Sequence, residues 1–183
     1  MTLKEKVLKI SLRILTVWGG ISFIGVIVMG GYLAYSMTLG NRNAEGKATK
    51  SDVGFVLNWC GLGDQRIEQV NNSYTSSRSL TNDHIDAYEI KITNVTIDEI
   101  KKNNGIGQWY RCDSLPKVLD EAVDFIGGWQ YKTPWFPTEE QIRTKDFYVY
   151  PQSIYCHGIT PTAVELIFIK PAESKIYYIS AKM

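Results

Sequence analysis

The sequence is short of the residues on which enzymes and cofactor-binding proteins most often depend. It has only two histidines, His84 and His157, among its 183 residues. Each is a poor partner for its chain neighbour, since Asp83 beside His84 and Cys156 beside His157 cannot easily converge on one ion or face one substrate. Gly61-Leu62-Gly63 lacks the third glycine and the preceding strand of a dinucleotide-binding turn. We therefore predict no metal, no cofactor and no catalytic residue of a recognisable type.

Basic charge is also scarce in most of the chain. Residues 1–50 carry seven basic and two acidic side chains, a net charge of +5. Residues 51–183 carry 13 basic and 17 acidic side chains, a net charge of −4. A nucleic-acid-binding domain needs a basic face to displace counterions from phosphate. The larger part of the chain is therefore not expected to bind nucleic acid, and its acidity would suit a basic protein partner.

Cysteine is limited to Cys60, Cys112 and Cys156. In an oxidising compartment two of the three could form a disulfide, leaving one thiol over, and the sequence does not choose among the three pairings. The alternative is that the three are small buried apolar residues.

One long stretch lacks charge altogether. Residues 14–40 contain no Asp, Glu, Lys or Arg, and as a helix they would exceed the roughly 30 Å hydrocarbon core of a bilayer. We predict a transmembrane helix over residues 14–39, with Trp18 and Tyr35 near its two interfaces. A cleaved signal peptide is the alternative, but its apolar region is usually only about 7 to 15 residues long.

The flanking charges predict the orientation of this helix. Residues 1–13 form a basic arm with Lys4, Lys6, Lys9 and Arg13, whereas three basic residues follow the span. Positive charge favours the cytoplasmic side, so we expect the N-terminus in the cytoplasm and the C-terminal part in the periplasm or outside the cell. We predict that the arm is an amphipathic extension of the helix along the inner membrane surface. Small residues at Gly30 and Ala34 could let a second helix pair with this one.

The rest of the chain predicts an α+β domain. Residues 40–52 have the composition of a linker, and residues 53–183 would form the domain. Residues 53–63 are either a short helix or a strand, and we favour the helix. The spacing of Ile67 and Val70 predicts that it continues to about Asn71-Asn72. Residues 86–95 alternate as a strand with one wet face, and residues 146–150, 163–170 and 175–182 are rich in strand-forming residues.

Three more helices are predicted between those strands. Thr96 with Glu99 and Thr138 with Gln141 match the capping box that begins a helix. Ser114-Leu115-Pro116 begins a longer one that ends at Gly127-Gly128. The expected fold is an antiparallel or mixed sheet with short helices packed on it.

Aromatic residues are unusually dense between positions 109 and 155, where eleven Trp, Tyr and Phe side chains occur. Most should lie in the core, but some could form a binding surface, since such rings contact proteins and stack on sugars. The predicted binding residues are Trp129, Tyr131, Trp135 and Phe136.

These observations lead to three functional hypotheses. The first is a membrane-anchored, non-catalytic domain that binds a protein partner outside the cytoplasm, a description that also fits toxin-neutralising immunity proteins. The second is a cell-wall or glycan-binding domain that uses the aromatic patch. The third is a membrane-tethered hydrolase with a site built from scattered residues, for which Asp83, His84 and His157 are the visible candidates.

Overall fold

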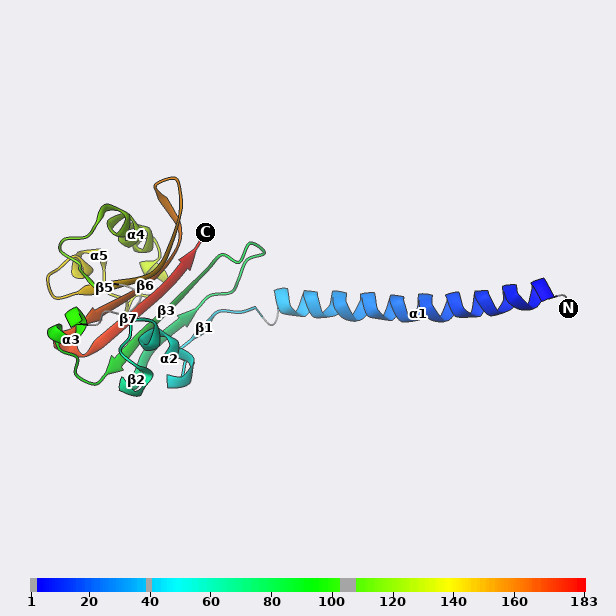
Figure 1. Ribbon diagram of the computed structural model, residues 1–183, viewed down its shortest axis with the longest axis horizontal. Coiled ribbons are helices and arrows are strands. Elements are labelled where there is room, and N and C mark those ends of the chain that lie inside the picture. Colours follow the sequence, from blue (N-terminus) through cyan, green and yellow to red (C-terminus); the bar gives the residue numbers. More distant parts are fainter. Residues whose placement is uncertain (1–2, 39–40, 103–107) are drawn as a thin grey trace. The chain divides into compact units, whose positions relative to one another are not determined.

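The N-terminal part of the chain is a single long helix. A computed structural model describes residues 3–38, 41–102 and 108–183. Helix α1 (Leu3–Met37) contains a segment, Lys9–Tyr35, of 27 residues that is long and apolar enough to cross a membrane (Figure 1). At 1.5 Å per residue this segment is about 40 Å long, which exceeds the hydrocarbon core. A signal sequence can have the same length and composition.

The basic arm is part of this helix, because α1 begins at Leu3 without a break before the apolar segment. Near its other end, the hydroxyl of Thr38 donates to the carbonyl of Ala34 over 2.6 Å. Leu39, where the predicted span ends, and Gly40 lie outside the described residues. Pairing of two helices through Gly30 and Ala34 stays a prediction.

The second unit, Asn43–Met183, is built on an antiparallel sheet of seven strands in the order β1-β2-β3-β7-β6-β5-β4. The fold is therefore α+β, as predicted from the sequence. The strands are β1 (Ala44–Glu45), β2 (Ile67–Thr75), β3 (His84–Ile92), β4 (Tyr110–Arg111), β5 (Tyr148–His157), β6 (Thr160–Lys170) and β7 (Lys175–Lys182).

Helices cover both faces of the sheet (Figure 1). On one face α4 (Lys117–Gly127) and α5 (Glu139–Ile142) pack on a core that includes Phe168. On the other face α2 (Lys50–Trp59) and α3 (Ile97–Lys102) pack on a core that includes Ile167. Successive residues of β6 thus belong to opposite cores, which is why this strand is apolar on both faces.

The strongest local signals predicted their elements well. Helix α3 begins directly after Thr96 as predicted, and its capping box forms, with the amide of Thr96 donating to Glu99 over 2.8 Å. The box at Thr138 and Gln141 also forms and begins α5. Strand β7 coincides with predicted residues 175–182. Short 3₁₀ turns lie at Asp64–Arg66, Gln130–Lys132 and Pro171–Glu173.

Two segments differ from the prediction. The helix expected to continue to about Asn71-Asn72 is not formed there. Residues 67–75 form β2, whose pairing with β3 is interrupted by two irregularities in register. Part of the predicted linker belongs to the domain, because Ala44 and Glu45 pair with β2, and α2 begins at Lys50.

The prediction that one face of residues 86–95 is exposed to solvent was also wrong in part. Glu89 points to the face that was predicted to be open, yet it is buried, with only 6% of its surface exposed. Its carboxylate accepts from Asn72 over 2.5 Å and pairs with Lys175 of the adjacent β7 over 2.9 Å. A buried charge needs such partners, and these come from neighbouring strands that periodicity within one strand does not reveal.

Candidate functional site: the Trp135 cleft

The chain between α4 and α5 contains two adjacent aromatic residues, of which one is buried and the other is half-buried. Phe136 is buried, and its ring packs edge-on against Tyr177 at 5.7 Å and Phe168 at 6.1 Å. Trp135 precedes it, with its ring 6.1 Å from that of Phe136, and remains half-buried. Phe136 therefore fixes the backbone from which Trp135 projects.

Helix α5 is held in place from both sides. Its first turn is closed by the capping box of Thr138 and Gln141. At its last turn, the guanidinium of Arg143 pairs with Glu139 over 2.8 Å and with Asp120 and Asp124 of α4. A planar guanidinium that engages several carboxylates restrains geometry better than one exposed pair would. The side of the cleft formed by α5 is thus well positioned.

A cleft of about 410 Å³ opens beside Trp135. Its lining comes from the loop before α5, from α5 and the segment after it, and from the end of β6, the β6–β7 turn and β7. The lining residues are Trp135, Pro137, Gln141, Thr144, Asp146, Phe147, Lys170, Glu173 and Tyr177. Such a volume lies within the range of ligand-binding pockets.

The cleft combines aromatic rings with charges. Phe147 and Tyr177 are largely buried and lie 6.1 Å apart, centroid to centroid. The ammonium of Lys170 lies 5.5 Å from the centre of the Phe147 ring and pairs with Glu173. The hydrogen bond from Lys170 lowers the pKa of Glu173, and burial raises the pKa of Tyr177. Near neutral pH the site therefore presents a carboxylate and a neutral phenol.

The four predicted binding residues do not form one patch. Trp135 lines the cleft, whereas Phe136 belongs to the core beneath it. Trp129 and Lys132 line a separate cavity of about 260 Å³ with residues of the β2–β3 loop, and Tyr131 between them is 75% exposed. The ammonium of Lys132 lies over both rings, 4.8 Å from the centre of Trp129 and 5.6 Å from that of Tyr131.

The three cysteines are not joined in a disulfide. Cys60 and Cys112 are buried in the cores on opposite faces of the sheet, and Cys156 is exposed near the β5–β6 turn. The bridge that the sequence allowed is therefore not formed in the structure. Cys60 and Cys112 fit the alternative prediction, because each is a small buried residue in an apolar core.

The three candidate hydrolytic residues, Asp83, His84 and His157, have different surroundings in the structure. Asp83 accepts from the hydroxyls of Thr81 at 2.5 Å and Ser79 at 2.9 Å. His84 contacts Ser180 Oγ through Nε2 at 3.1 Å, and His157 is exposed at the end of β5. Across residues 3–38, 41–102 and 108–183, His, Cys, Asp and Glu form no group of three that could hold a metal ion.

Several lining residues were not predicted from the sequence. Phe147, Lys170 and Tyr177 are brought to Trp135 by the pairing of β5, β6 and β7. A pattern within one segment cannot show such a meeting of distant segments. Comparisons with protein families, with curated proteins and with solved structures found no match to this chain.

Proposed function

We propose that this chain is a single-pass membrane protein whose C-terminal domain binds a protein partner outside the cytoplasm. The observation that carries the proposal is the Trp135 cleft, where a half-buried tryptophan fixed by a core phenylalanine stands beside charged side chains. An aromatic centre with a polar rim is the usual anatomy of a protein-binding hot spot.

The anchor follows from the length and composition of α1. The segment Lys9–Tyr35 is long and apolar enough to cross a membrane, and a bilayer is the environment that would remove its side chains from water. Four basic residues precede the span and favour a cytoplasmic N-terminus. A protease added outside intact cells should then remove the domain, and a domain that survives this treatment would reverse the orientation.

Site-specific photocross-linking in cells tests the partner. A photoreactive amino acid at Thr144, in the cleft, should yield a discrete adduct with a second protein. The same amino acid at Lys117, on the exposed side of α4, is the matched control and should not. Trp135→Ala should abolish the adduct, because truncating a hot-spot residue costs at least about 2 kcal/mol of binding. An adduct of equal yield in the Trp135→Ala protein would reject the cleft as the binding site.

A glycan is the second candidate ligand. It is favoured by the polar groups around Trp135, among them Gln141, Thr144 and Asp146, because a sugar stacks one face on a ring and hydrogen bonds at its edge. The full chain should then be retained on isolated cell-wall material, and Trp135→Ala should lose this retention. Such a result, together with no protein adduct at Thr144, would favour the glycan.

A further inference from the structure

One end of the sheet receives the chain from α1, and we call it the proximal end. It comprises Asn43, the β2–β3 loop (residues 76–83), the β5–β6 turn (residues 157–160) and Met183. The strand register places these segments together, because Lys182 of β7 pairs with both His84 of β3 and Ala163 of β6. The loop and the turn thus both extend past the end of β7. The Trp135 cleft lies at the other end, beside the β6–β7 turn.

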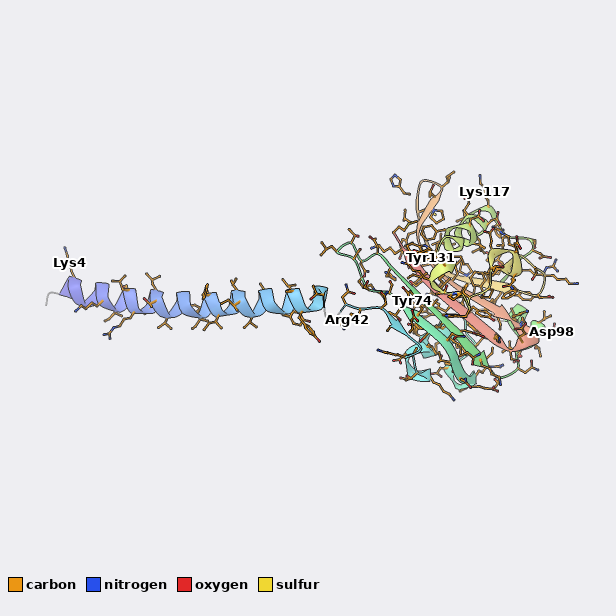
Figure 2. All side chains as sticks on the ribbon, turned by 180° about the vertical axis from the view of Figure 1, so that it is seen from behind. Lys4, Arg42, Tyr74, Asp98, Lys117 and Tyr131 are labelled. Carbon is orange, nitrogen blue, oxygen red and sulfur yellow. The ribbon has the colours of Figure 1, made fainter. Side chains whose placement is uncertain are left out.

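The proximal end carries the most exposed large apolar side chains among the described residues of the domain. They are Leu80 at 85%, Ile159 at 76%, Tyr131 at 75%, Tyr155 at 66% and Met183 at 63%. Tyr131 belongs with them because its neighbours Trp129 and Lys132 line a cavity with Asn43, Ser76 and Asp83. In Figure 2, Tyr131 and Tyr74 lie toward one end of the domain and Asp98 toward the other.

Single exposed apolar residues are ordinary on protein surfaces, but a group at one end is not. Elsewhere on the described surface of the domain, the large apolar side chains that are exposed are Trp59, Ile97 and Val118, which lie on three different helices or at their ends. Leu80 and Ile159 occupy projecting turns, where Gly158 adopts φ 64°. Neither turn requires a bulky aliphatic side chain for its own geometry.

The proximal end is also joined to α1 by a short piece of chain. Asn43 is fixed to the domain, since its side-chain oxygen accepts from the amide of Ser77 over 2.8 Å. Five Cα-to-Cα steps separate Thr38, whose amide still bonds back to α1, from Asn43. Fully extended, these steps span at most about 18 Å. A domain of this size has a radius of gyration of about 14 Å, so the chain length keeps this end near whatever surface α1 crosses.

We propose that the proximal end rests in the headgroup layer of the bilayer, with Leu80 and Ile159 inserted as apolar tips and Tyr131 and Tyr155 at the interface. This inference rests on the proposed membrane anchor. Tyrosine suits the interface because its ring is apolar and its hydroxyl is polar. The proposed contact is apolar, and the nearby cations are engaged within the domain: Arg78 pairs with Asp86, Lys182 donates to the carbonyl of Thr81, and Lys132 lies over the Trp129 and Tyr131 rings. The Trp135 cleft is then turned away from the membrane, toward a partner.

The native thiol of Cys156 provides the probe. It is exposed beside the β5–β6 turn, whereas Cys60 and Cys112 are buried. The full chain is labelled at Cys156 with an environment-sensitive fluorophore and reconstituted in phosphatidylcholine vesicles that contain lipids with a nitroxide quencher. The matched control carries Cys156→Ser and Ala172→Cys, which moves the label to the exposed β6–β7 turn at the other end of the sheet.

We expect quenching of the label at Cys156 and none at position 172. The double substitution L80S/I159S should lower the equilibrium constant for contact at least about tenfold, because it replaces both apolar tips with polar side chains that gain nothing from leaving water. Both side chains are exposed, so thermal unfolding should match that of the unsubstituted chain. Quenching at Cys156 should persist in 0.5 M salt, roughly the range where charge contacts are strongly screened.

Equal quenching of the two labels, in a chain that stays in the vesicles at alkaline pH, would overturn the inference and leave the anchor intact. Loss of quenching in high salt would overturn the apolar contact. A chain that leaves the vesicles at alkaline pH would overturn the anchor itself, and the inference with it.

Discussion

At the scale of single residues, the three cysteines show how position in the fold sets chemistry. Burial raises the pKa of Cys60 and of Cys112 to about 12, so at neutral pH both are neutral thiols inside the protein. The thiolate is the reactive species, and neither buried group supplies it readily. Cys156 lies at the exposed end of β5, where a reagent in solution can reach its sulfur.

Thiol titration tests this assignment. In the folded protein at pH 8, a water-soluble disulfide reagent should modify one thiol per chain within minutes, and after unfolding without reductant it should modify three. Cys156→Ser should leave no fast-reacting thiol. Only one reactive thiol after unfolding would instead reveal a disulfide between the other two.

Phe168 is the largest side chain that is fully buried, and Phe136 packs on it edge-on. Phe168→Ala should lower the free energy of unfolding by about 3–5 kcal/mol, because the substitution leaves a large cavity under the cleft. Denaturant unfolding of the full chain in detergent measures the change. Val118→Ala, on an exposed side chain of α4, is the control and should change stability by no more than about 0.5 kcal/mol. A loss in Phe168→Ala as small as in this control would contradict the assigned core.

At the scale of elements, α3 is fixed by its first turn. The carboxylate of Glu99 accepts from the backbone and the hydroxyl of Thr96 and pairs with Arg66 over 2.8 Å. The hydrogen bond from the Thr96 amide, with that from Arg66, lowers the pKa of Glu99 from 4.5 to about 2. Because the pKa of Glu99 is lower in the folded protein than in the unfolded chain, its carboxylate stabilises the fold at any pH above the unfolded pKa. This stabilisation is lost as the pH falls toward the folded pKa.

Glu99→Gln should therefore be less stable than the unsubstituted chain above pH 5, and the difference should shrink between pH 4.5 and about 2. Urea unfolding across that range measures it, with Asp98→Asn at the adjacent exposed position as the control. A stability difference that is the same at every pH would mean that the carboxylate charge has no part in holding the helix.

How far the sequence predicts an element depends on how local its signal is. The starts of α3 and α5 follow from capping boxes, each of which lies within four residues. Strand β2 was mistaken for a helix because the irregularities in its pairing, between Ile67 and Gln69 and between Val70 and Asn72, break the alternation of apolar residues. Strands β1 and β4 have two residues each, which is too short for any periodicity.

The candidate site was predictable only in part for the same reason. The density of aromatic residues pointed to Trp135, and the pair Trp135-Phe136 between Pro134 and Pro137 is a local feature of the sequence. Lys170 and Tyr177 join it through strand pairing, which no pattern within a segment reveals. Tyr131 is close to Trp135 in sequence, yet it lies beside the cavity at the opposite end of the sheet.

At the scale of the whole molecule, the sheet gives the domain two chemically different ends. The proximal end carries exposed aliphatic and tyrosine side chains, and the other end carries a cleft with charged groups. Strand β7 joins the two ends over seven residue steps, about 23 Å at the usual rise. A domain held at the first end by a membrane helix would present the second to a partner, and both proposals depend on retention of α1.

Retention of α1 is tested most directly by tagging the full chain at both termini and extracting cell membranes with alkaline carbonate. Because an apolar helix of about 40 Å spans the bilayer, we predict that one species carrying both tags stays in the membrane pellet. A shorter, soluble species that has kept the C-terminal tag and lost the N-terminal one would show that α1 is a cleaved signal sequence. That result would contradict the account.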